Sequence, residues 1–196
     1  MSLDEIYLEP EDDIAPGSVQ PVVLTSESGE REIALIRWGF KLPDGLLFTA
    51  RSEGIDQAKC WKDSFLERRC IVPADAIFEW PKVEHGRKKP KYEVVILGQE
   101  PFGIAGVWKP RKNPKTHQWE RAFAVITGEP NELIQPIHHR LTTILDPHDY
   151  EEYLTIADRP AVHLLRVLPA ERMRATRIEE SNAAGPQLDL FNTDQE

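Results

Sequence analysis

Apolar and polar residues alternate along most of this chain with a period of two, which is typical of half-buried β-strands. Clusters of Gly and Pro, such as Pro43–Gly45, separate the alternating stretches and predict turns. The predicted strands are Val19–Thr25, Glu32–Trp38, Leu46–Ala50, Arg69–Val72, Ala76–Trp80, Lys91–Leu97, Phe102–Trp108, Arg121–Thr127 and Ala161–Leu168. The pattern therefore predicts a protein built mainly from strands.

Helical patterns are fewer. We expect helices near Ala58–Arg68, around Pro130–Gln135 and at Pro147–Thr155, where Asp146 suits the N-cap and Pro147 the first helical position. Many strands with a few inserted helices indicate an α+β domain, mainly β, with curved, barrel-like antiparallel sheets. The composition turns polar and small near the end, so we expect one domain over residues 1–178 and a flexible acidic tail over 179–196.

The composition fits a cytoplasmic globular protein. The chain has 196 residues, 40% of them hydrophobic, and its longest apolar runs fall well short of the ~18 residues that span a membrane. The first thirteen residues carry six acids and no base, unlike a secretory signal. Cys60 and Cys70 are too few for a disulfide framework and lack zinc-site spacing, so we expect inert packing thiols, no metal and no cofactor.

The net charge of −9 argues against a nucleic-acid partner until its distribution is considered. Residues Met1 to Asp13 contribute six of the nine negative charges. Two central stretches are basic: Lys82–Lys91 and Lys109–Arg121 each hold five bases and one Glu. Each stretch alone is best explained as a solvated hairpin loop, whereas together they are compatible with a polyanion partner.

Five short segments combine functional side chains with a turn or a strand end. They are Ile14–Gly17, Arg37–Phe40, Thr49–Glu53, Val72–Trp80 and Pro136–Arg140. Their order and spacing resemble the signature segments of the SRAP family (SOS-response-associated peptidase), and the resemblance runs from Asp13 to about Leu190. The ordered set, with its Phe-Glu-Trp and Ile-His-x-Arg elements, makes it specific. It implies a DNA-repair protein that recognises abasic sites in single-stranded DNA.

Glu79 and His138 are the candidate catalytic residues. Glu79 lies between Phe78 and Trp80, so strand alternation turns it away from its aromatic neighbours, either into solvent or into a pocket that would raise its pKa. His138 is either a structural residue or a proton shuttle. The resemblance implies that both transfer protons, and it places His139 at a variable position.

The resemblance also implies residues that contact DNA. Arg51 and Arg140 match arginines that hold the DNA backbone, although either one could form a structural salt bridge, with Glu53 a candidate partner for Arg51. Trp80 and Trp38 could stack on bases, with core packing an equal alternative for Trp38. Thr49 stands where the family usually has an asparagine that orients the lesion. The stretch Pro43–Leu46 lacks the tryptophan that some relatives carry.

The family's covalent chemistry uses an amino-terminal cysteine, exposed by removal of the initiator Met, whose amine and thiol trap the abasic aldehyde. Here Ser2 follows Met1, and Ile14–Gly17 comes early. Either the true start lies upstream or the nucleophile has been lost. The first hypothesis is therefore an abasic-site enzyme that forms, or once formed, a DNA–protein crosslink. The alternative is a catalytically impaired module that binds single-stranded or damaged DNA.

The tail holds a separate motif. Gln187, Leu188, Asp189, Leu190 and Phe191 resemble the peptide by which bacterial replication and repair proteins bind the DNA sliding clamp. Such a peptide needs an extended segment whose Leu and Phe side chains enter apolar pockets. The alternative is that these apolar residues pack back on the domain. The clamp is thus a second expected partner, beside abasic single-stranded DNA.

Overall fold

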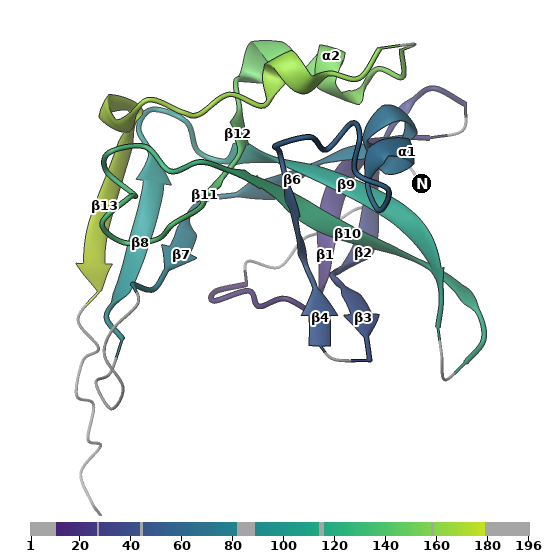
Figure 1. The fold of residues 1–196 in the computed structure, drawn as a ribbon, viewed down its shortest axis with the longest axis horizontal. Helices are drawn as coiled ribbons and strands as arrows, with labels where there is room; N and C mark the ends of the chain where they lie inside the picture. Colours follow the sequence, from purple (N-terminus) through teal and green to yellow (C-terminus); the bar gives the residue numbers. More distant parts are fainter. Residues whose placement is uncertain are drawn as a thin grey trace, which may run out of the picture.

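Strands predominate in the fold (Figure 1). The computed structural model describes residues 11–26, 28–43, 45–81, 89–113, 116–157 and 159–178. The strands are β1 (Val19–Thr25), β2 (Arg31–Trp38), β3 (Phe40–Leu42), β4 (Gly45–Leu47), β5 (Thr49–Arg51), β6 (Arg69–Ala74), β7 (Ile77–Glu79), β8 (Lys91–Ile96), β9 (Phe102–Lys112), β10 (Trp119–Gly128), β11 (Leu141–Thr142), β12 (Ile144–Leu145) and β13 (Met173–Ile178). The helices are α1 (Lys62–Glu67) and α2 (Tyr150–Leu154), with 3-10 turns η2 (Pro147–Asp149), η3 (Val162–Leu164) and η4 (Ala170–Arg172).

The largest sheet closes on itself. Its strands follow the order β10-β2-β1-β6-β9, and β9 pairs again with β10. Most neighbours are antiparallel, but closure uses a parallel pairing of β10 with β2, and β5 adds to β10 in parallel. The barrel-like sheet that the alternating sequence predicted is therefore confirmed. Along each strand, every second side chain fills the inside of the barrel and the others face outward.

Two hydrophobic clusters lie on the two faces of the barrel wall. Val22, Ile36 and Phe123 belong to the inner cluster. Ile71 and Ile126 point to the opposite face of their strands and belong to the outer cluster, which α1 and α2 cover. The alternation therefore specifies which face each strand residue occupies.

A three-stranded sheet, in the order β13-β8-β7, packs at the end of the barrel where β6 and β10 finish. Val94, Ile96 and Met173 of this sheet join the inner cluster, and Ile77 of β7 packs against it. The sheet thereby places β7 beside this end of the barrel.

Several expected elements are confirmed. The bounds of β1 match the prediction, and the predicted Asp146 cap is present, since its carboxylate accepts a hydrogen bond from the backbone N–H of His148. The predicted strand Leu46–Ala50 divides at Phe48 into β4 and β5. None of the helices among the described residues is long and apolar enough to cross a membrane.

Three expectations about secondary structure were wrong. The segment Ala161–Leu168 is not a strand: it contains η3, and its buried residues Ala161, Leu164 and Leu168 are spaced by three and four positions rather than two. The segment Pro130–Gln135 forms turns instead of a helix. The strand β13 was missed, because its polar outer residues resemble the composition of the tail that follows.

Candidate functional site

The side chain of Glu79 faces the interior at the end of β7. It shares its strand face with Ile77, which packs against the inner cluster, and it is only 15% exposed. Phe78 lies on the other face, where the Lys91 ammonium sits 3.7 Å from its ring centroid. Burial raises the pKa of Glu79, and nearby His138 partly opposes this shift. Of the two orientations that the strand pattern allowed, Glu79 therefore has the inward one, as a largely buried carboxyl.

His138 lies beside Glu79. The turns before it are fixed by Asn131, whose side chain accepts from the N–H of Ile134 and donates to the carbonyl of Leu168. The His138 Nδ1 atom is 3.4 Å from a carboxylate oxygen of Glu79 and 2.9 Å from the Arg140 carbonyl. With its proton on Nδ1 the ring donates to one of these acceptors and leaves Nε2 to accept a substrate proton, whereas with its proton on Nε2 the Nδ1 atom accepts from the Arg140 N–H.

The Arg140 guanidinium is held by the carboxylate of Glu53, although Arg51 lies much nearer to Glu53 in the sequence. Its Nη1 and Nη2 atoms donate to the two oxygens of Glu53 at 2.6 and 2.7 Å, and Nη2 also donates to the Thr127 carbonyl. This bidentate contact lowers the pKa of Glu53, because the guanidinium stabilises the charged carboxylate. The expected pairing of Glu53 with Arg51 is thus replaced by a pairing with Arg140.

Arg51 and Thr49 share one face of β5, opposite buried Ala50. The strand runs along β10, with Arg51 beside Thr127 and Thr49 beside Val125. Arg51 is exposed, and its guanidinium forms no ion pair within the described part of the chain. Its positive charge also helps to lower the pKa of Glu53, so it lies in the same electrostatic environment as Arg140.

The two candidate DNA-binding tryptophans differ in their exposure to solvent. Trp80 is 45% exposed and follows Glu79 directly, with Lys91 5.9 Å from its ring centroid. Trp38 is half-buried, stacks on Phe123 with 7° between the ring planes, and donates its indole N–H to the Phe48 carbonyl. The packing role considered for Trp38 is therefore what the geometry shows, whereas Trp80 offers an open ring face.

The two cysteines also differ in their exposure to solvent. Cys70 is fully buried in β6, and burial raises the pKa of its thiol, as expected of a packing residue. The packing role expected for Cys60 was wrong, since Cys60 is exposed and its sulfur lies 3.3 Å from the Lys109 ammonium. Within the described ranges, no group of three or more His, Cys, Asp or Glu residues could hold a metal ion.

The site thus links Glu79 to His138 and His138 to Arg140, and Arg51 lies near Arg140 through their shared neighbour Glu53. Thr49 lies on the same strand as Arg51, β5, which pairs with β10. Sequence reasoning missed that Thr127 anchors Arg140, because that contact depends on β10 lying beside β5. Of the two basic stretches, residues 82–88 lie outside the described part of the chain, and Lys109–Arg121 spans the paired ends of β9 and β10. The motif Gln187–Phe191 also lies outside it.

The sequence profile of the family described as SOS response associated peptidase (SRAP) matches residues 2–182 of this chain. The chain belongs to the SRAP family. Three relatives are named abasic site processing proteins. The Bacillus subtilis (strain 168) protein YoqW is 25% identical over 159 residues, which cover 78% of this chain and 70% of YoqW. YoaM of the same organism is 28% identical over 153 residues, covering 74% of this chain and 65% of YoaM.

The third relative, HMCES of Xenopus tropicalis, is 26% identical over 200 residues, and the match covers 84% of this chain and 59% of HMCES. Solved structures share the fold of this SRAP protein. A Bordetella bronchiseptica protein has a TM-score of 0.72 at 25% identity, with 88% of this chain and 90% of that chain covered. A Bacteroides thetaiotaomicron protein has a TM-score of 0.71 at 23% identity, with 84% and 75% covered.

Proposed function

We propose that this SRAP protein acts in DNA repair by processing abasic sites in single-stranded DNA. The observation that carries the proposal is the contact between Glu79 and His138, 3.4 Å apart, with the pKa of Glu79 raised by burial. The names of its relatives YoqW, YoaM and HMCES agree with the assignment.

The chemistry of an abasic site explains why such a pair is useful. The ring-opened lesion is an aldehyde, and an attacking amine forms a carbinolamine that must lose water to become an imine. The departing hydroxyl needs a proton. Glu79 retains its proton to higher pH than an ordinary carboxyl, so it can donate that proton, and His138 can accept one from the attacking amine.

Binding of the strand is assigned to groups at the rim of the same site. Arg51 has no ion-pair partner among the described residues, so its guanidinium can bind a backbone phosphate, whereas Arg140 accepts a phosphate only by giving up part of its contact with Glu53. The exposed ring of Trp80 provides a stacking face for a base, and Thr49 supplies a hydroxyl for orienting the lesion. Trp38 supports this site from the barrel interior.

A second candidate function is non-covalent recognition of damaged single strands without turnover. The observations that favour it are the exposed side chain of Arg51 and the 45% exposed ring of Trp80, because these groups can hold a strand without forming a bond to it. The first proposal has a more specific version. In it, removal of the initiator Met exposes an amino-terminal cysteine, which forms a covalent crosslink with the lesion.

One experiment tests both candidates: incubation with a single strand that contains one abasic site, followed by denaturing and native gels. A band retarded on the denaturing gel, and lost in Glu79→Gln and His138→Ala, supports covalent processing. Retardation only on the native gel supports the binding module. An equal response to an undamaged strand would contradict both.

The clamp-binding motif is tested separately. Replacing Leu190 and Phe191 together by Ala should abolish binding to the bacterial sliding clamp, because these side chains would be the apolar anchors. The same double variant should bind abasic DNA as the original chain does. Unchanged clamp binding, measured by surface plasmon resonance, would eliminate this partner.

A further inference from the structure

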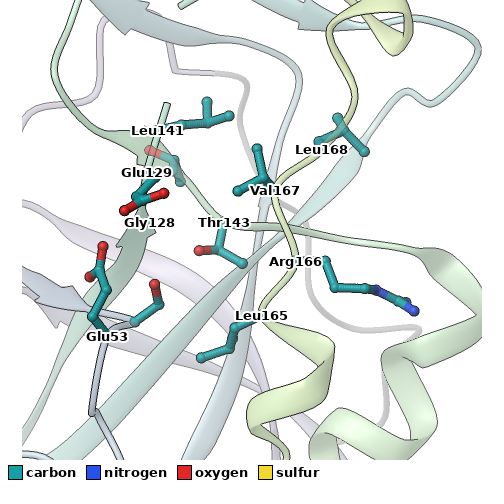
Figure 2. Close-up of a pocket in the computed structure, with 11 residues that line it drawn as sticks. Glu53, Gly128, Glu129, Leu141, Thr143, Leu165, Arg166, Val167 and Leu168 are labelled. Carbon is teal, nitrogen blue, oxygen red and sulfur yellow. The ribbon is translucent and has the colours of Figure 1, made fainter. Parts of the chain in front are cut away.

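A cavity of about 200 Å³ lies behind the Glu53–Arg140 pair. Its walls come from the end of β10, from β11 and from the segment after η3, and Figure 2 shows the carboxylates of Glu53 and Glu129 and the hydroxyl of Thr143 turned toward the same space. Leu141, Leu165 and Leu168 supply an apolar side. The cavity is therefore polar on one side and apolar on the other.

Thr143 carries the strongest sign that this space takes a ligand. Thr143 is only 5% exposed, and no described residue forms a hydrogen bond with its hydroxyl, which faces the cavity. Its backbone is fixed, because its N–H donates to the Ile126 carbonyl and its carbonyl accepts from the N–H of Ala105, both at 2.9 Å. The hydroxyl can therefore donate a hydrogen bond to, or accept one from, a ligand that enters the cavity.

Gly128 keeps the cavity open. A Cβ atom at this position would lie 3.1 Å from the hydroxyl oxygen of Ser52 and 3.9 Å from that of Thr143. An alanine here would therefore fill the space between the two hydroxyls. The residue is otherwise an ordinary strand position at the end of β10, paired with Leu141.

The charges around the cavity indicate what it would accept. Glu53 is committed to Arg140, and Arg166 extends away from the cavity to pair with Asp149. Glu129 is exposed and forms no ion pair in the described part of the chain, so its carboxylate is the free acceptor. The cavity is smaller than the ~300–1,000 Å³ sites of drug-sized ligands. A small, flat, partly apolar group with N–H donors fits these walls.

We propose that this cavity receives the base next to the abasic site, and that it favours a base with an exocyclic amine over thymine. Carboxylates accept hydrogen bonds from such amines, whereas thymine has no exocyclic amine and offers a carboxylate only its N3–H, which is flanked by two repelling carbonyl oxygens. The position beside Arg140 and Arg51 suits a base whose phosphate those arginines contact. The inference rests on the proposed function for the identity of the polymer.

The test compares single strands that carry a stable abasic analogue flanked by cytosines or by thymines, with binding measured by fluorescence anisotropy. The original chain should bind the cytosine-flanked strand about tenfold more tightly, the usual size of one good base contact. Gly128→Ala and Thr143→Val should each reduce the preference below about twofold and leave the thymine-flanked affinity unchanged. Thr176→Val, at an exposed position on β13, should keep the full preference.

Thr143→Val also tests whether the hydroxyl has only a structural role. Valine keeps the shape of the side chain and removes the unpaired hydroxyl, so the variant should melt at the same or a higher temperature. Loss of the preference together with a lower melting temperature in both variants would overturn the assignment. A full preference in Gly128→Ala would do the same.

A nucleoside titration separates this inference from the proposed function. If the chain did not distinguish abasic from undamaged strands, the proposed function would fail, and the cavity would be judged on nucleosides alone. Deoxycytidine should shift the NMR methyl signal of Thr143 in the original chain and not in Gly128→Ala, and thymidine should leave it in place. No shift with deoxycytidine, deoxyadenosine or deoxyguanosine would mean that the cavity holds only water.

Discussion

Two arginines on opposite sides of the barrel wall show how one residue type serves two purposes. Arg69 begins β6 on the side covered by α1 and α2, and its guanidinium donates to the carbonyls of Phe65 and Leu66 and to those of Tyr153 and Thr155. It thereby caps the carboxyl-terminal ends of both helices. Burial lowers its pKa.

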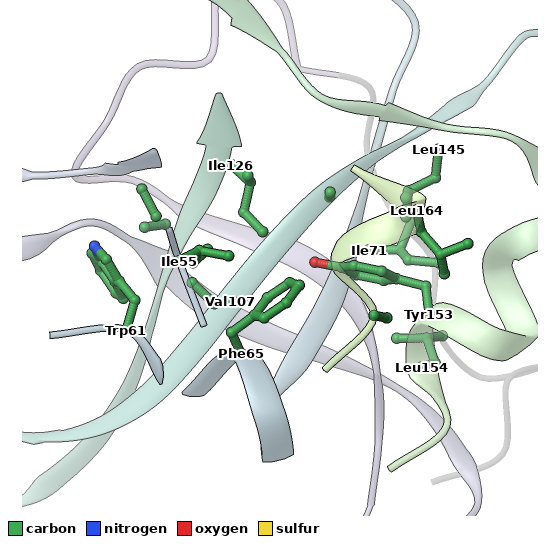
Figure 3. Close-up of a cluster of buried hydrophobic side chains, with 14 of the residues drawn as sticks. Ile55, Trp61, Phe65, Ile71, Val107, Ile126, Leu145, Tyr153, Leu154 and Leu164 are labelled. Carbon is green, nitrogen blue, oxygen red and sulfur yellow. The ribbon is translucent and has the colours of Figure 1, made fainter. Parts of the chain in front are cut away.

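Arg140, directly before β11, is held instead by the side chain of Glu53 and the carbonyl of Thr127. The difference lies in the acceptors. Backbone carbonyls cannot leave Arg69, whereas a carboxylate can exchange with a phosphate at Arg140. The helix-covered side, which includes Phe65 and Tyr153 (Figure 3), is therefore expected to determine stability, and the candidate site to determine activity.

The largest expected effect belongs to Glu79. Glu79→Gln should slow processing of abasic DNA by about 10²–10⁴-fold, the usual contribution of a positioned proton-transfer group. The same substitution should raise the stability of the folded protein at neutral pH, although it lowers activity. The folded-state pKa of Glu79 lies above the ordinary carboxyl value of 4.5, so its contribution to stability is present below that pH and is lost as the pH rises through the raised value.

Thermal melts from acidic to neutral pH check this sign. Glu79→Gln should gain stability relative to the original chain as the pH rises, because glutamine avoids the cost of a buried negative charge. A variant that loses both activity and melting temperature at neutral pH would show that Glu79 is a structural residue.

Arg69→Met should have the largest effect on stability. Methionine fills part of the space but leaves buried carbonyls without donors, so we expect a loss of about 3 kcal/mol in the free energy of unfolding. Urea denaturation measures this loss. The specific activity of the folded fraction should be unchanged, and a selective loss of DNA binding would show that the two sides of the wall are not separate.

Glu53→Gln tests whether the Glu53 carboxylate competes with a DNA phosphate for Arg140. Removing the carboxylate charge frees the guanidinium for phosphate, so single strands should bind several-fold more tightly, with a salt slope steeper by about 0.7, the value for one phosphate contact. Glu30→Gln, which removes an equal charge from the exposed β1–β2 turn, should change neither quantity. Weaker binding by Glu53→Gln would show that Glu53 supports Arg140 rather than competing for it.

The smallest effect is expected at Asp146, which caps η2 before α2. Asp146→Ala should cost about 1 kcal/mol. Hydrogen bonds from His148 lower the pKa of Asp146 to about 2, so the advantage of the original chain should persist at neutral pH and disappear as the pH falls from 3.8 through 2. Melts across this range measure it, and a difference that survives below pH 2 would contradict the cap.

Alternation along the strands predicted much of this protein, because burial on one face constrains every second residue. It gave the bounds of β1 and placed Glu79 on the strand face opposite Phe78, but it left open which of these two faces points inward. It could not predict the partner of Glu53, since Arg51 is near in sequence but Arg140 is brought closer by β10. The unpaired hydroxyl of Thr143 was equally invisible, because it depends on which segments line the cavity.

Proton transfer by Glu79 and His138 can be separated from binding by a single-turnover time course on a strand with one abasic site, resolved on denaturing gels. We expect conversion by the original chain at neutral pH, a loss of at least about 10²-fold in Glu79→Gln, and no reaction with an undamaged strand. Equal rates for the original chain and Glu79→Gln would rule out proton transfer by Glu79.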